Sequence, residues 1–143
     1  MPLYVPERFS ASARSVAQDV RQLPYTALHQ LEVSNAFELL VGRGLITRDE
    51  CRAILQQVQD DLEGQRLTPL ALDLERVFAD AGELSRRHTA RFLARSLDLL
   101  HVAAAHLALC KTFVSADDRQ LAVAKASGLT VVDIKRRIRR RRR

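Results

Sequence analysis

Three acidic residues of this chain stand beside apolar segments, where solvation alone explains them poorly. Asp98 comes at the start of an apolar stretch, and Asp117 closely follows the apolar run 112–114. Glu32 lies on or beside an apolar row if its segment is a helix. Carboxylates gathered at the edge of a core repel one another and lose solvation, and a hard divalent cation relieves both effects. The pattern therefore favours a Mg²⁺ or Mn²⁺ site, because these ions prefer oxygen ligands.

Each acid also has a purely structural interpretation. Asp98 could complement the macrodipole at a helix start, and Asp117 could be the N-cap of the helix that follows it. Glu32 could lie on the solvated edge of its apolar row. Taken singly, these alternatives are favoured. The occurrence of all three acids beside apolar elements is what favours a shared site.

Hydrophobic periodicity and turn residues divide the chain into alternating helices and short strands. Helices are expected at about 6–21, 29–41, 47–62, 73–88, 97–109 and 118–127. Strands are expected at about 24–28, 66–70, 112–114 and 130–132. Thr47 and Glu50 form a capping-box pattern, and Gly128 is placed to end a helix. This order predicts an α/β domain whose short, mainly parallel sheet is flanked by helices and binds ligands at the carboxyl ends of its strands.

The positive charge of the chain is confined to its carboxyl end. The net charge is +6, but residues 135–143 carry eight positive charges, and subtracting these leaves −2 for residues 1–134. We expect a folded domain over 1–134 and a disordered basic tail over 135–143 that binds RNA or another polyanion. A solubilising extension is the equally weighted alternative. The tail residues expected to contact nucleic acid are Lys135, Arg136, Arg137, Arg139 and Arg140.

Several other kinds of site and location are disfavoured. Cys51 and Cys110 lie far apart without CxxC spacing, which favours reduced thiols over a disulfide or a zinc site. The chain has no glycine-rich phosphate loop, HExxH or GxSxG motif. No apolar run approaches the ~20 residues that span a membrane, so a cytoplasmic protein without a membrane anchor is expected.

Four segments around these acids resemble the PIN-domain family of metal-dependent ribonucleases, especially the VapC-type toxins of toxin–antitoxin pairs. The segments are LEVSNA at 31–36, LDLLHVAAA at 97–105, FVSADDRQL at 113–121 and GLTVV at 128–132. The resemblance extends over most of residues 3–134. It implies a three-layer α/β domain and hydrolysis of RNA phosphodiester bonds. It further implies a homodimer that a cognate antitoxin silences by occupying the acidic groove.

The resemblance also implies a role for individual residues. Glu32, Asp98 and Asp117 match the acids that hold the catalytic Mg²⁺ or Mn²⁺ in the family. Ser115 matches a residue that supports the site by hydrogen bonding, and Asp118 matches a more variable neighbouring position.

The amino terminus departs from the family pattern. PIN domains begin with a central strand that carries a metal-binding aspartate, whereas no acid precedes Glu7 in this chain. The domain over 1–134 is therefore expected to be amino-terminally truncated. The alternative function is a catalytically impaired PIN-like remnant that binds an antitoxin or RNA without cleaving it.

Overall fold

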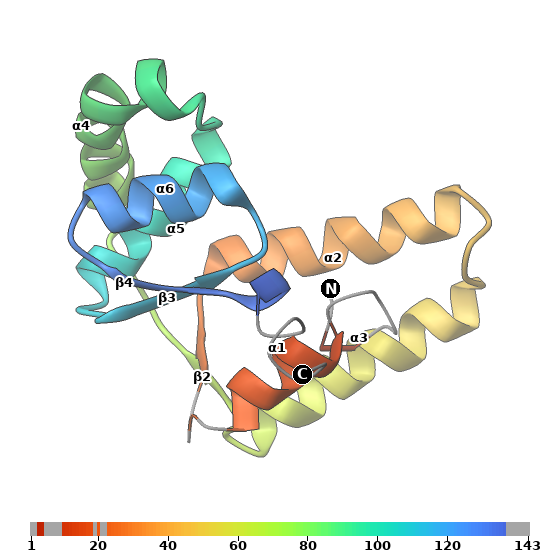
Figure 1. Ribbon diagram of the computed structural model, residues 1–143. Helices are drawn as coiled ribbons and strands as arrows, with labels where there is room; N and C mark the ends of the chain where they lie inside the picture. Colours follow the sequence, from red (N-terminus) through yellow and green to blue (C-terminus); the bar gives the residue numbers. More distant parts are fainter. Residues whose placement is uncertain (1–2, 5–9, 19, 21–22, 137–143) are drawn as a thin grey trace. The chain divides into compact units, whose positions relative to one another are not determined.

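The chain forms two compact units, Met1–Ala71 and Leu72–Arg143 (Figure 1). The computed structural model describes residues 3–4, 10–18, 20 and 23–136. In each unit, helices pack around one two-stranded parallel sheet. This arrangement confirms the expected α/β class and the parallel strand pairing.

The first unit contains two short strands and two long helices. Its elements are α1 (Ser10–Gln18), β1 (Leu23–Tyr25), α2 (Ala27–Gly42), α3 (Arg48–Glu63) and β2 (Leu67–Pro69). The strands pair in parallel, with Leu23 opposite Leu67. Helices α2 and α3 contact each other and enclose a core with the strands (Figure 1). That core consists of Tyr25, Val33, Phe37, Cys51, Val58 and Leu67.

The caps of the two long helices explain where these helices begin. The capping box predicted for α3 is confirmed: Thr47 Oγ1 accepts from the Glu50 amide at 3.1 Å, and Glu50 Oε2 accepts from the Thr47 amide at 2.7 Å. Helix α2 begins two residues before the predicted start. Thr26 is its N-cap, and His29 Nδ1 accepts from the Thr26 amide at 3.2 Å. The prediction was wrong here because a histidine closes this capping box in place of the usual Glu or Gln.

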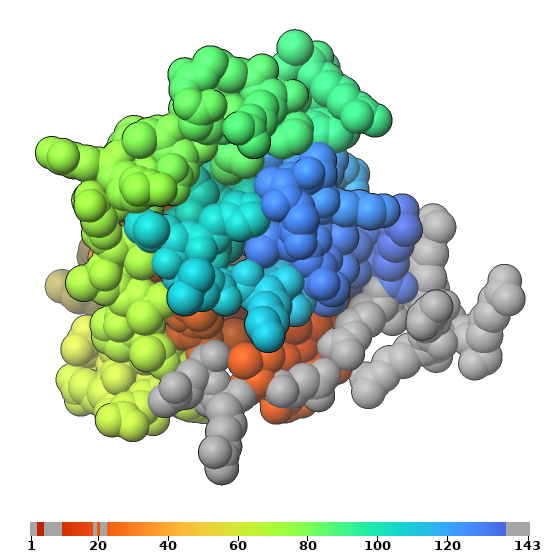
Figure 2. Space-filling model, turned by 90° about the vertical axis from the view of Figure 1, so that its left-hand side faces the viewer, coloured from red at the N-terminus to blue at the C-terminus, as the bar shows by residue number. Residues whose placement is uncertain are grey.

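The second unit carries the remaining elements. They are α4 (Leu74–Phe92), α5 (Ser96–Leu107), β3 (Thr112–Ser115), α6 (Asp118–Ala126) and β4 (Thr130–Asp133). The two strands pair in parallel from Thr112 opposite Thr130 to Ser115 opposite Asp133. Helix α6 connects the strands and packs on both of them, and α5 contacts α4 and α6. In the space-filling view, α4 (green) and α6 (blue) both form part of this unit's surface (Figure 2).

Left-handed residues follow all three helices of the second unit, namely Leu93 after α4, Leu109 after α5 and Gly128 after α6. Leu93, with φ 55°, ends α4 four residues beyond the predicted boundary, at a position without the glycine or proline that marks a helix end in sequence. Gly128, with φ 99°, follows α6 as predicted, because glycine adopts this conformation without a Cβ penalty.

Two further expectations concern the cysteines and the membrane. Cys51 is buried, Cys110 is half-buried and both are free thiols, as predicted. Among the helices that the structure describes, none is long and apolar enough to cross a membrane.

Loss of the α3 capping box should destabilise the protein. Thr47→Ala removes the acceptor of the Glu50 amide and should lower the free energy of unfolding by about 1 kcal/mol in urea titrations. Thr47→Ser keeps a hydroxyl acceptor and is the matched control, with a much smaller loss. Equal losses in the two variants would contradict a capping role.

The same capping box should make stability depend on pH. The Thr47 amide, and then its hydroxyl, hold the pKa of Glu50 below its usual range. A carboxyl group whose pKa is lowered by folding stabilises the protein above its unfolded pKa of about 4.3, and this contribution disappears as the pH falls through the folded pKa. Glu50→Gln keeps an oxygen acceptor but has no titrating carboxyl group, so the stability difference between wild type and Glu50→Gln should shrink in urea titrations below about pH 4. A constant difference down to pH 2 would rule out Glu50 as the partner.

Candidate functional site

Two of the three predicted metal ligands, Asp98 and Asp117, come together in the second unit at the starts of α5 and α6. Asp98 is the third residue of α5, and its Oδ2 accepts from the Arg95 amide at 2.9 Å. Asp117 follows β3 and is the N-cap of α6. Its Oδ1 accepts from the amides of Arg119 and Gln120 at 2.9 and 3.3 Å. The structural interpretations of both acids are therefore confirmed, and the same capping geometry fixes where the carboxylates lie.

One guanidinium joins the two carboxylates. Arg95 Nε donates to Asp98 Oδ2 at 3.3 Å, and Arg95 Nη2 donates to Asp117 Oδ2 at 3.0 Å. Asp98 is only 5% exposed, whereas the Arg95 side chain is 66% exposed. The hydrogen bond to Asp98, followed by the charges of Asp98 and Asp117, raises the pKa of Arg95.

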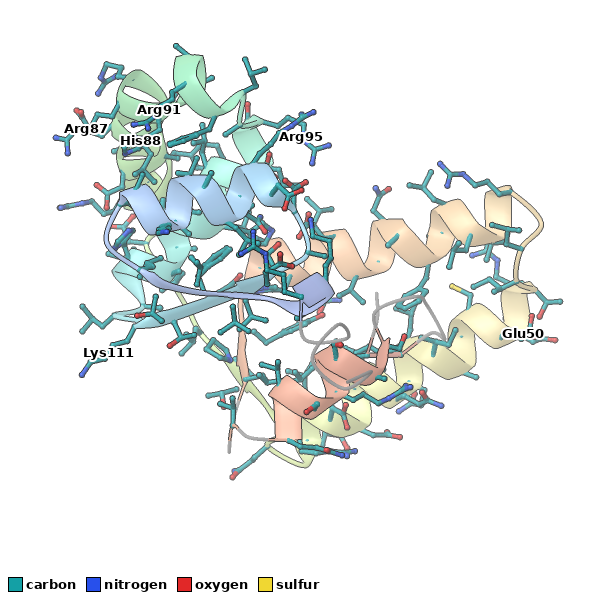
Figure 3. The ribbon with its side chains drawn as sticks, in the orientation of Figure 1. Glu50, Arg87, His88, Arg91, Arg95 and Lys111 are labelled. Atoms are coloured by element: carbon teal, nitrogen blue, oxygen red, sulfur yellow. The ribbon has the colours of Figure 1, made fainter. Side chains whose placement is uncertain are left out.

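Arg95 lies apart from the basic residues of α4 that Figure 3 labels. Figure 3 shows it where α4 gives way to α5, on the opposite side of this unit from Arg87. The labelled residues Arg87, His88 and Arg91 come from α4 itself. Of the arginines labelled in Figure 3, Arg95 is the one that forms ion pairs with Asp98 and Asp117.

Ser115 fixes the turn that carries Asp117. Its Oγ accepts from the Asp117 amide at 3.0 Å and donates to Gln120 Oε1 at 2.7 Å. These bonds tie the end of β3 to the first turn of α6, so that Ser115 orients the backbone of Asp117 rather than its carboxylate.

Glu32 belongs to the other unit and is described apart from this pair. It is a half-buried residue of α2, next to the fully buried Val33, which lies one turn from the buried Phe37. No group of three or more His, Cys, Asp or Glu side chains placed to hold a metal occurs among residues 3–4, 10–18, 20 and 23–136. The structure thus brings together two of the predicted ligands and leaves the third as a sequence-based expectation.

Asp118 and the first tail residues lie around α6 and β4. Asp118 is largely exposed, and its Oδ1 accepts from Lys135 Nζ at 2.6 Å. Arg136 forms an ion pair with Asp133 at 3.4 Å. The other tail residues predicted to contact nucleic acid, Arg137, Arg139 and Arg140, lie outside the described part of the chain.

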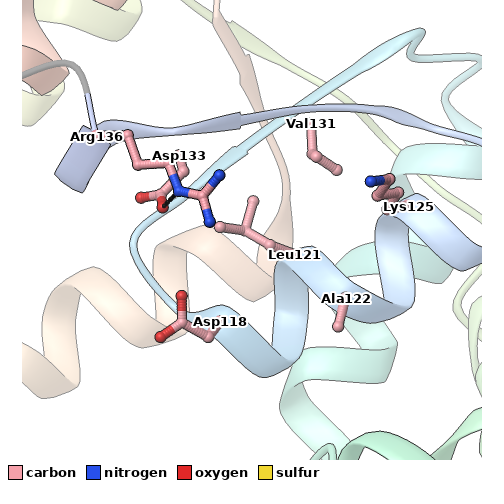
Figure 4. A pocket seen from close by; sticks show the side chains of 7 residues that line it. All are labelled: Asp118, Leu121, Ala122, Lys125, Val131, Asp133 and Arg136. Atoms are coloured by element: carbon pink, nitrogen blue, oxygen red, sulfur yellow. Dashed lines mark ion pairs between the residues drawn. The ribbon is translucent and has the colours of Figure 1, made fainter. Parts of the chain in front are cut away.

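A pocket of about 310 Å³ lies between α6 and β4 (Figure 4). Asp118 and Asp133 line it together with Lys125 and Arg136, and Leu121 and Val131 provide apolar surface. The lining includes neither Asp98 nor Asp117, so this pocket is separate from the carboxylate pair.

Two residues near the candidate site were missed in the sequence. The sequence does not indicate a role for Arg95, because a single arginine before a helix is common. Asp133 does carry a signal, since it directly follows an apolar strand, as Asp117 nearly does. It lies opposite Ser115 in the sheet, and its side chain is only 16% exposed.

The donor atoms at this site suit a magnesium ion. Mg²⁺ is commonly held by one or two carboxylates, with waters or substrate phosphates completing its coordination. Asp98 and Asp117 supply two carboxylates that already share a cation. The pair therefore fits the expected ion, with Arg95 as a competing positive charge.

No protein-family model matches the chain, and no curated protein matches it. The carboxylate pair and its hydrogen bonds are therefore the basis for the function proposed below.

The capping role of Asp117 can be separated from its charge. Asp117→Ala should lower the free energy of unfolding by about 1 kcal/mol, because α6 loses its N-cap. Asp117→Asn should lower it much less, since asparagine caps helices as well as aspartate and an exposed ion pair contributes little. Urea titration measures the free energy of unfolding of both variants. Equal losses in the Asn and Ala variants would show that the charge of Asp117, and not its capping oxygen, dominates its contribution to stability.

Proposed function

We propose that this protein is a metal-dependent endoribonuclease that hydrolyses RNA phosphodiester bonds, as the VapC-type toxins that it resembles do. The observation that carries the proposal is the convergence of Asp98 and Asp117 on one guanidinium at two helix starts. We assign these two residues as catalytic and metal-binding, with Mg²⁺ or Mn²⁺ as the cofactor. Glu32 is the third proposed ligand, on the resemblance alone.

The chemistry of the site follows from its charges. A divalent ion bound by the carboxylates would activate water and neutralise charge on the scissile phosphate. The chain's own contribution is position: the capping bonds hold Asp98 and Asp117, and Ser115 holds the turn before α6. Helix starts carry a partial positive charge, so the beginnings of α5 and α6 also favour the approach of a phosphate.

The proposed partners follow from the toxin resemblance. RNA is the substrate, a cognate antitoxin covers the acidic groove, and the active protein is a homodimer. The basic tail over 135–143 adds affinity for RNA without taking part in hydrolysis, because its positive charges act on the RNA backbone through charge alone.

A binding module without catalysis is the second candidate. The observation that favours it is that the described residues bring together two of the three predicted ligands, Asp98 and Asp117, and not a group of three. Such a PIN-like remnant would bind RNA or an antitoxin but would leave RNA intact in the presence of Mn²⁺.

Neutralising either carboxylate should weaken metal binding. Asp98→Asn and Asp117→Asn keep side-chain shape and remove one negative charge, so calorimetric titration should show at least about tenfold weaker Mn²⁺ binding, and RNA cleavage should be lost. Asp80→Asn is the matched control, because Asp80 lies on α4 of the same unit and pairs only with Arg76 among the described residues.

The Mn²⁺ titration and the RNA cleavage assay together distinguish the ribonuclease from the binding module. Equal Mn²⁺ affinity in wild type, Asp98→Asn and Asp80→Asn would exclude Asp98 as a ligand. Asp98-dependent Mn²⁺ binding without RNA cleavage would favour the binding module.

The tail should bind RNA through charge alone. Removing 137–143 deletes six arginines but leaves the ion pairs of Lys135 and Arg136 in place. RNA affinity should fall, and the slope of its logarithm against log salt should become shallower, because fewer counterions are released. A chain whose residues 137–143 are replaced by serine and glycine controls for length. Unchanged affinity and slope in both chains would mean that the tail is inert.

A further inference from the structure

Arg95 binds both Asp98 and Asp117, the two carboxylates that the proposed metal would need. We propose that Arg95 is a built-in counter-ion, which competes with the divalent metal for the two carboxylates and is released when the metal binds. The inference rests on the proposed metal-dependent function, and it assigns to that site a regulatory residue at the N-cap of α5.

The hydrogen bonds show that the guanidinium can leave without disturbing either helix. Asp117 caps α6 through Oδ1, whereas Arg95 contacts its Oδ2. Asp98 Oδ2 also accepts from the Arg95 backbone amide, and this bond does not depend on the side chain. The carboxylates therefore remain in place when Arg95 turns away.

The charges explain why some cation is required. Asp98 is 5% exposed, and a carboxylate in that position suffers desolvation and repulsion from Asp117 unless a positive charge is near. Arg95 brings one charge, whereas Mg²⁺ or Mn²⁺ brings two and bonds directly to oxygen. The guanidinium is 66% exposed, so its ion pairs are screened by water and are readily exchanged.

Because the Arg95 side chain is exposed, it can bind a second partner once the metal has released it. An arginine fork matches the geometry of phosphate oxygens as well as that of carboxylates. Once displaced by the metal, Arg95 stays at the edge of the site and can contact the RNA backbone.

Calorimetric titration of the full chain with Mn²⁺ tests the competition. Arg95→Gln removes the competing charge and should bind Mn²⁺ about 2- to 30-fold more tightly than wild type, the range expected from the loss of two exposed ion pairs. Arg119→Gln is the matched control. Arg119 is exposed at the start of α6 and forms no side-chain ion pair within the described residues, so it tests the general effect of one lost positive charge.

A second measurement does not depend on how well the variant folds. In wild type, the Arg95 Nε–H should be protected from hydrogen exchange by its bond to Asp98. Added Mg²⁺ should remove that protection in nuclear magnetic resonance spectra of the wild-type protein. Two results together support the proposal. Mg²⁺ removes the protection of Arg95 Nε–H in wild type, and Arg95→Gln binds Mn²⁺ more tightly than Arg119→Gln does.

The contrary results differ in what they overturn. Mn²⁺ binding that requires Asp98 but is equal in wild type and Arg95→Gln overturns the counter-ion role and leaves the metal site standing. Mn²⁺ binding that is absent, or insensitive to Asp98→Asn, overturns the metal site and the counter-ion role together.

Discussion

The carboxylates of Asp98 and Asp117 share one partner, the Arg95 guanidinium, and this ion-pair cluster is the interaction on which the candidate site depends. Asp98 is almost fully buried, so hydrogen bonds and a nearby positive charge must offset the solvation that its carboxylate loses. Backbone amides supply the hydrogen bonds through the caps of α5 and α6. The guanidinium supplies the charge, and because it is exposed it is the one member of the cluster that solvent or another cation can replace.

Local capping chemistry explains how much of the fold could be predicted from the sequence. Thr47 and Glu50 predict the start of α3, and Gly128 predicts the end of α6. These residues act on backbone groups within a few positions of themselves, so the local sequence is enough to identify the boundary. The start of α2 at Ala27 and the end of α4 at Phe92 were missed. A histidine completes the capping box at the start of α2, and a left-handed leucine ends α4. Neither residue type marks a helix boundary in general.

The candidate site was predictable only in part, for a similar reason. Asp117 was identified because an acid after a short strand and before a helix is a local pattern, and Asp98 because it interrupts an apolar run. Arg95 was missed because its importance arises from a contact with Asp117, 22 positions away along the chain. Glu32 lies in the other compact unit, so its relation to the pair is a tertiary question that local spacing does not address.

A crystal structure of the protein grown with Mn²⁺, with anomalous scattering recorded for manganese, tests the central claim most directly. The account predicts a manganese peak bonded to the carboxylate oxygens of Asp98 and Asp117, with the Arg95 guanidinium turned away from both. The helix caps made by Asp98 and Asp117 should be unchanged. Manganese bound elsewhere, with Arg95 still joining the two carboxylates, would contradict both the metal site and the exchange of one cation for the other.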